Sequence, residues 1–157
     1  MSRDAAFEEA RIKAAAFIGI NRSKSSGRVR RNLLGKGVEP AIADEVVRYF
    51  TEIDYINDGR AAQAVASRYQ GRKTRSRRAM LQTLIQNGID TEAARRFVEG
   101  LEDDPTTALE LCRHLAPVIE EGRLDQAMKE LVRRGYPAGL ARDTIRKYLA
   151  LEKSQGA

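Results

Sequence analysis

Residues 68–89 read R-Y-Q-G-R-K-T-R-S-R-R-A-M-L-Q-T-L-I-Q-N-G-I. The second half of this stretch predicts a short helix that Ser76 caps and Gly88 ends. The side chains expected to be buried on this helix are Met80, Leu81, Leu84 and Ile85. The first half carries six basic residues and no acidic one: Arg68, Arg72, Lys73, Arg75, Arg77 and Arg78. The same combination of a helix and a terminal glycine occurs once before this stretch and once after it.

Three glycines, Gly37, Gly88 and Gly135, stand in the same local pattern. Glycine adopts the left-handed conformation that ends many helices at little cost, so each one predicts a helix C-terminus. Apolar residues stand four and three positions before each glycine and one position after it, and Ala stands six positions after it. The apolar pairs are Leu33–Leu34, Leu84–Ile85 and Leu131–Val132; the following residues are Val38, Ile89 and Tyr136; the alanines are Ala43, Ala94 and Ala141. We expect the small Ala to let the next helix approach closely.

Helical periodicity and capping residues predict two further helices around each of these units, with Ser25 or Ser26 as one cap and a break at Pro117. The predicted helices are Asp4–Ile20, Arg28–Gly35, Pro40–Ile53, Asn57 or Asp58–Tyr69, Ser76–Gly88, Asp90–Leu101, Asp104–Leu115, Leu124–Arg134 and Pro137–Leu151. The fold class is therefore all-α, as three tandem three-helix repeats stacked into an elongated, curved array. The repeats span residues 4–55, 56–102 and 103–151, and residues 152–157 form a frayed tail.

The composition narrows the class of protein. The chain has 157 residues, 42% of them hydrophobic, with no Trp. The single cysteine, Cys112, excludes an internal disulfide and fits a reducing compartment. The first residues show no apolar signal core, and no stretch is long and apolar enough to span a membrane. We expect a monomeric protein of the cytoplasm.

Charge is unevenly distributed along the chain, whose net charge is +6. Residues 10–38 hold eight basic residues and residues 59–89 hold seven, and neither stretch holds an acidic one. Both precede or include a glycine-ended helix with a Ser cap, and free amides at a helix N-terminus combined with arginines suit an anion. We interpret these stretches as a binding surface rather than a solvated basic face. The candidate contact residues are Arg28, Arg30, Arg31, Lys36, Arg68, Arg72, Lys73, Arg75, Arg77 and Arg78.

The residues that usually carry catalysis are scarce. His114 and Cys112 stand close together, but no further His or Cys completes a metal site. Gly35 and Gly37 belong to a helix end and not to a phosphate loop. No convincing base accompanies a Ser or Cys nucleophile. We therefore expect no enzyme activity, no metal and no cofactor.

Three motifs stand out: Ser25-x-x-x-Val29-x-x-x-Leu33-x-x-Lys36-Gly37, the segment Tyr55-Ile56-Asn57-Asp58, and the basic-loop helix Ser76–Ile89. They resemble the RecX family of bacterial RecA modulators. The resemblance covers about Ala14–Val98, and the third repeat matches in architecture. It implies a partner, the RecA filament on single-stranded DNA, whose recombinase, ATPase and coprotease activities the chain would inhibit during DNA repair, recombination and the SOS response.

Two other classes of function stay open. A helical-repeat regulator could bind duplex DNA without RecA, through a helix-turn-helix-like geometry. The helices that would enter the groove carry acids, among them Asp44 and Glu92, which phosphate would repel. A plain helical scaffold would have no nucleic-acid partner at all.

Overall fold

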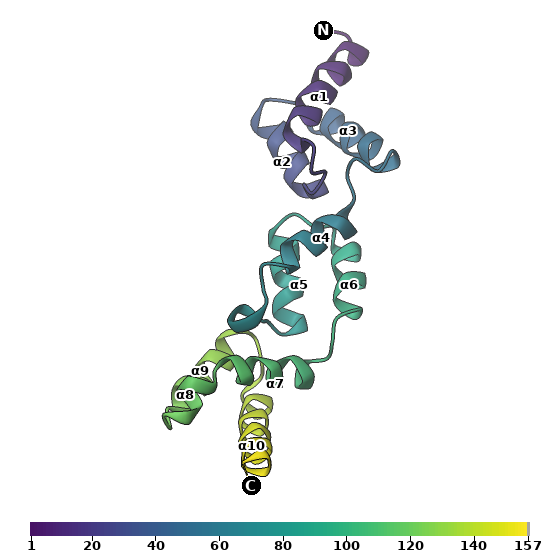
Figure 1. Ribbon diagram of the computed structural model, residues 1–157. Coiled ribbons are helices and arrows are strands. Elements are labelled where there is room, and N and C mark those ends of the chain that lie inside the picture. Colours follow the sequence, from purple (N-terminus) through teal and green to yellow (C-terminus); the bar gives the residue numbers. More distant parts are fainter. Residues whose placement is uncertain (157) are drawn as a thin grey trace. The chain divides into compact units, whose positions relative to one another are not determined.

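The computed structural model describes residues 1–156 and is all-helical over this part, with no strand (Figure 1). This confirms the predicted all-α class. The helices are α1 (Arg3–Ile18), α2 (Ser26–Gly35), α3 (Pro40–Glu52), α4 (Asp58–Ala66), α5 (Arg77–Gln86), α6 (Thr91–Glu99), α7 (Asp104–His114), α8 (Ala116–Glu120), α9 (Leu124–Arg133) and α10 (Ala138–Gln155). A short 3₁₀ helix, η1 (Gly71–Lys73), lies in the basic stretch before α5.

The helices divide into two compact units. Unit 1 consists of Met1–Val65 and Thr83–Phe97, and unit 2 consists of Ala66–Gln82 and Val98–Ala157. Helix α5 crosses from one unit to the other along the chain. The division into three repeats stays a prediction.

Unit 1 has its core where α1, α2 and α3 pack together (Figure 1). This core contains small residues: Ala14 of α1 and Ala43 of α3 are completely buried in it. Val29 and Leu33 of α2 fill the space between them, and both are also fully buried. Ala43 therefore lies inside the core, and the close approach of the helices there stays a prediction.

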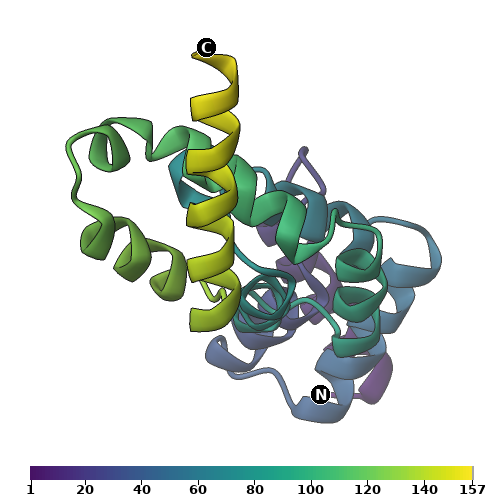
Figure 2. The same cartoon turned by 90° about the horizontal axis from the view of Figure 1, so that it is seen from below.

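Unit 2 has a separate core in which α10 packs against α7 and α9 (Figure 2). Leu111, Leu131 and Tyr136 are almost completely buried in it. The Tyr136 hydroxyl finds a partner in Thr107 Oγ1 at 2.8 Å, which satisfies the one polar group that the ring brings inside. Burial raises the pKa of Tyr136 to about 12, so the hydroxyl stays protonated near neutral pH.

The three glycines end their helices as predicted. Gly37, Gly88 and Gly135 have φ angles of 84°, 82° and 99°. In each case the glycine N–H donates to the carbonyl three residues back, and the next N–H donates to the carbonyl five residues back, at 3.0–3.1 Å. This pair of hydrogen bonds satisfies two carbonyl groups that have no partner at the end of a helix.

At Gly88, the end of α5 receives the beginning of α2, and both lie in unit 1. Gly27 N donates to Gly88 O at 2.9 Å, and Ser25 Oγ donates to Asn87 O at 2.7 Å. The backbones are so close that a Cβ on Gly27 would lie 2.7 Å from Gly88 O. Open amides of one helix and open carbonyls of another thus satisfy each other.

At Gly135, within unit 2, the end of α9 receives the beginning of α5 in the same way. Ser76 N donates to Arg134 O at 3.0 Å. A Cβ on Gly135 would lie 2.4 Å from Ser76 Oγ and 2.6 Å from the Ala79 Cβ. We call these two contacts the Gly27–Gly88 junction and the Ser76–Gly135 junction.

Several helix boundaries differ from the predicted ones; for example, α1 ends at Ile18 and α2 begins at Ser26. Asp104 was predicted as the cap of α7, but the N-cap is Asp103, whose carboxylate accepts from Thr106 N at 3.0 Å, and Asp104 is the first helical residue. Hydrogen bonds from the side chain and, to a smaller extent, the backbone of Thr106 lower the pKa of Asp103. Helix α10 continues past Leu151 to Gln155, because most of residues 152–155 favour helix and no glycine follows Leu151 before Gly156. Ala157 lies outside the described residues.

Two further predictions were wrong, one for the end of α4 and one for a buried side chain. Tyr69 lies beyond the end of α4, where its N–H donates to Ala66 O at 3.0 Å in a turn. Ile85, expected inside, is 41% exposed. Its neighbour Leu84 is fully buried, and adjacent residues on a helix point about 100° apart, so α5 cannot bury both on one narrow face.

The Gly27–Gly88 junction can be tested with two glycines of the same helix. Alanine favours helix over glycine by roughly 0.5–1 kcal/mol, and open space surrounds Gly35, so Gly35→Ala should raise the free energy of unfolding by up to that amount. Gly27→Ala should instead lower it by about 1–3 kcal/mol, because its Cβ meets the backbone of Gly88. Urea unfolding of both variants measures the difference. A stabilising Gly27→Ala would contradict the junction.

Candidate functional site

The N-terminus of α2 is closed by groups of the chain itself. Ser25 is the N-cap, and its Oγ accepts from Arg28 N at 3.2 Å. Asp58, the first residue of α4, accepts from Ser26 N at 2.8 Å and from Ser26 Oγ at 2.5 Å. The same carboxylate accepts from Asp90 N at 2.7 Å, just before α6. Asp58 therefore ties together the starts of three helices of unit 1.

The N-terminus of α5 is closed in the same manner within unit 2. Ser76 Oγ accepts from Ala79 N at 3.1 Å, and Asp104 Oδ1 accepts from Arg77 N at 2.9 Å. Asp104 is the first residue of α7, as Asp58 is the first residue of α4. In each unit, a carboxylate thus accepts a hydrogen bond from an amide at the N-terminus of another helix.

These bonds correct one interpretation of the sequence. The amides at the starts of α2 and α5 were expected to be free for an external anion. They are taken instead by Asp58, Asp104 and the carbonyls at the two junctions. Asp58 and Asp104 supply the negative charge that a helix N-terminus favours, so basic residues in these first turns cost little. Any binding by the basic stretches must therefore use arginine and lysine side chains.

Most of the candidate contact residues are exposed, and their side chains are available for an external partner. Within residues 1–156 the side chains of seven candidates form no hydrogen bond or ion pair: Arg28, Arg31, Lys36, Arg68, Arg72, Lys73 and Arg78. Arg28 and Arg31 are three residues apart on α2, so they lie on one face, and Arg28 also lies 5.9 Å from the centre of the Phe17 ring. Arg68, Lys73 and Arg78 come from the segment around η1, in unit 2.

The other three candidates have partners within the chain. Arg30 is paired with Asp44 at 2.7 Å, and Arg75 lies over the Tyr69 ring at 4.1 Å. Arg77 is half-buried, and its guanidinium donates to the carbonyls of Leu101 and Glu99. These contacts hold the loop before α7 against the start of α5, so Arg77 has a structural role.

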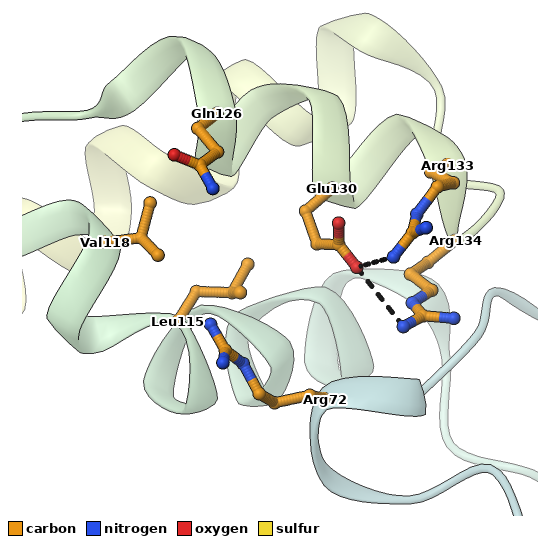
Figure 3. Close-up of a pocket in the computed structure, with 7 residues that line it drawn as sticks. All are labelled: Arg72, Leu115, Val118, Gln126, Glu130, Arg133 and Arg134. Atoms are coloured by element: carbon orange, nitrogen blue, oxygen red, sulfur yellow. Dashed lines mark hydrogen bonds and ion pairs between the residues drawn. The ribbon is translucent and has the colours of Figure 1, made fainter.

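The structure also brings together arginines that sequence reasoning missed. Arg72 of η1 lines a pocket with Arg133 and Arg134 from the end of α9, all within unit 2 (Figure 3). Arg134 stands immediately before Gly135, the position that Lys36 holds before Gly37. That equivalence could have identified Arg134 as a candidate from the sequence. It was missed because α9 also contains acidic residues, which made the third repeat look less basic.

The structure shows the surroundings of Cys112 and His114. Cys112 is fully buried, and burial raises the pKa of its thiol to about 11. His114 is exposed and lies 3.6 Å from Glu110. Within residues 1–156 no group of three or more His, Cys, Asp or Glu side chains could hold a metal ion. None of the ten α-helices in that range has the length and apolar character needed to cross a membrane.

No protein-family model matches the chain, and no solved structure matches it. The protein named Regulatory protein RecX of Thermobifida fusca (strain YX) is 33% identical to it over 138 residues, which are 83% of this chain and 72% of that relative. The chain belongs to the RecX family. Regulatory protein RecX of Streptomyces lividans is 30% identical over 90% of this chain and 80% of its own length. Regulatory protein RecX of Corynebacterium efficiens is 27% identical, with coverages of 94% and 76%.

Membership of the RecX family confirms the resemblance that the sequence suggested and extends its range. The motifs carried the resemblance over about Ala14–Val98, whereas these three relatives match 83–94% of the chain. The pocket arginines of α9 lie beyond Val98.

The carboxylate of Asp58 gives a direct test of this part of the RecX-family fold. Asp58→Ala removes three hydrogen bonds and leaves the amides of Ser26 and Asp90 without their acceptor, so the free energy of unfolding should fall by about 2–4 kcal/mol. Asp44→Ala removes the same charge from an exposed ion pair and should cost no more than ~0.5 kcal/mol. Chemical denaturation of both variants compares them, and equal small losses would mean that Asp58 does not join the helices.

Proposed function

We propose that this chain is a non-enzymatic regulator that binds the RecA filament on single-stranded DNA in the cytoplasm and inhibits its recombinase, ATPase and coprotease activities. The observation that carries the proposal is the similarity to proteins named Regulatory protein RecX over most of the chain. The action on RecA is what the family resemblance implies.

The exposed cations support an electrostatic mode of binding. Unit 1 presents Arg28 and Arg31 on one face of α2, and unit 2 presents Arg68, Lys73 and Arg78 around η1 and α5. A nucleoprotein filament offers DNA phosphates and acidic protein side chains, both of which arginine binds through charge-assisted hydrogen bonds. Such binding weakens as salt is raised, because salt screens the charges and competes for phosphate.

The stacking of three repeats, 4–55, 56–102 and 103–151, into an elongated, curved array is part of this proposal. It is supported by the two junctions, which repeat the same contact, and by the equivalent roles of Asp58 and Asp104. Small-angle X-ray scattering of the protein in solution would measure its maximum dimension and its oligomeric state, which we propose to be a monomer.

We favour the filament over direct reading of duplex DNA. In a helix-turn-helix arrangement α3 and α6 would enter the major groove. Both helices expose acids, namely Asp44, Glu52, Glu92 and Glu99, and a phosphate backbone would repel them. Sequence-specific binding to duplex DNA in the absence of RecA would favour this alternative.

Two double variants test the proposed contacts. Addition of the wild-type protein to RecA, single-stranded DNA and ATP should reduce ATP hydrolysis and strand exchange. Arg28→Gln/Arg31→Gln and Arg68→Gln/Arg78→Gln should each need about fivefold more protein for half-maximal inhibition, since exposed charge contacts contribute roughly 0.5 kcal/mol each.

A matched control removes two positive charges elsewhere. Arg95 and Arg113 lie in short-range ion pairs with Glu92 and Glu110 on their own helices. Arg95→Gln/Arg113→Gln should leave inhibition within about twofold of wild type, the shift that a contribution below ~0.5 kcal/mol allows. Absence of inhibition by the wild-type protein at any concentration would refute the action on RecA. Equal losses in all three variants would show that only net charge matters.

A further inference from the structure

Unit 2 contains an arginine-lined pocket (Figure 3). Its volume is about 280 Å³. One wall comes from η1, one from the end of α7 and from α8, and one from α9. The lining residues are Arg72, Leu115, Val118, Gln126, Glu130, Arg133 and Arg134.

The charges in the pocket do not balance. Glu130 is the single acid, and its Oε1 lies 2.6 Å from Arg133 Nη2 and 3.2 Å from Arg134 Nη2. Arg72 has no hydrogen bond or ion pair to any residue from Met1 to Gly156. Arg134 is only 16% exposed, and its Nε is buried without a partner among those residues. Three arginine side chains thus line a pocket that holds one carboxylate.

Glu130 also shows what the site accepts. A carboxylate already lies between two of the arginines, so the geometry of the pocket suits this group. A second carboxylate that reached Arg72 would bring the charge closer to balance. The dense charge of a phosphate backbone would be repelled more strongly by Glu130.

Two apolar side chains lie at the floor of the pocket, Leu115 and Val118. Leu115 is 2% exposed and Val118 is 6% exposed, so both are held in the core and leave a small, fixed apolar surface at the pocket. Figure 3 shows the Arg72 guanidinium beside Leu115, with Gln126 farther along the same pocket. An apolar floor next to an unpaired cation suits a ligand that carries an apolar group beside an anionic one.

We propose that this pocket binds a short acidic segment of a partner protein. A Glu or Asp side chain of the segment pairs with Arg72, and a neighbouring Leu or Ile side chain covers Leu115 and Val118. Nucleic acid presents phosphates without such an aliphatic group, so a peptide matches both parts of the pocket and DNA matches one. The inference depends on the geometry of unit 2 and not on the proposed action on RecA.

The test uses the full chain and a fluorescein-labelled peptide of alternating Glu and Leu, with fluorescence anisotropy as the measurement and RecA absent. Arg72→Gln should weaken binding about tenfold, the usual effect of losing one charge-assisted hydrogen bond. Gln126→Glu should also weaken it severalfold, because the new charge repels the peptide. Both positions are exposed, and circular dichroism confirms that the variants keep their helices.

Matched controls separate the pocket from general charge. Arg142→Gln removes an exposed positive charge elsewhere in unit 2, and Gln63→Glu adds a negative charge in unit 1; neither residue lines the pocket. Both controls should bind the peptide within about twofold of wild type, as expected for exposed charges without a specific contact.

Three results would overturn the proposal. Equal binding of a peptide with Gln in place of each Glu would show that no anion is recognised. Equal losses for Arg72→Gln and Arg142→Gln would show a diffuse basic surface. Displacement of the peptide by oligo-dT, with DNA binding that itself requires Arg72, would assign the pocket to phosphate.

Discussion

The ends of a helix carry amides and carbonyls that have no partner within the helix, and in this chain helix ends are joined to satisfy them. The junctions at Gly88 and Gly135 place the first amides of one helix on the last carbonyls of another. This contact requires glycine on the receiving side, because any Cβ there would collide with Ser25 or Ser76.

The same arrangement explains how a basic chain tolerates arginines at helix N-termini. Asp58 and Asp104 bring carboxylates to these positions from elsewhere in the sequence. The carboxylates bind backbone amides at the helix N-termini and not the arginine side chains. The side chains of Arg28, Arg31 and Arg78 remain exposed to solvent. A chain that balanced its arginines with nearby acids would have a neutral surface at these places.

Local patterns predicted nine of the ten α-helices in residues 1–156. The glycine ends and the caps Ser25, Ser76 and Asp90 each depend on a few neighbouring residues, so they were visible in the sequence. The bond from Asp58 to Ser26 spans 32 residues and that from Asp104 to Arg77 spans 27, and no short-range rule indicates such pairings. For the same reason the arginines of the pocket could not be grouped, since Arg72 and Arg134 are far apart in the chain. Ten basic residues looked equivalent, and only their surroundings separate Arg77, which holds a loop, from its exposed neighbours.

The connection between α3 and α4 has a consequence for how related chains can differ. It has no regular secondary structure, yet both of its ends are fixed. Tyr55 N and Ile56 N donate to Phe50 O at 2.9 and 3.1 Å, and Asp58 meets Ser26 and Asp90 two residues later. One inserted or deleted residue between Ile56 and Asp58 would move the carboxylate by about 3.5 Å, beyond hydrogen-bonding distance. Alignments of homologous chains should therefore run without gaps through this loop, although loops are where gaps usually occur.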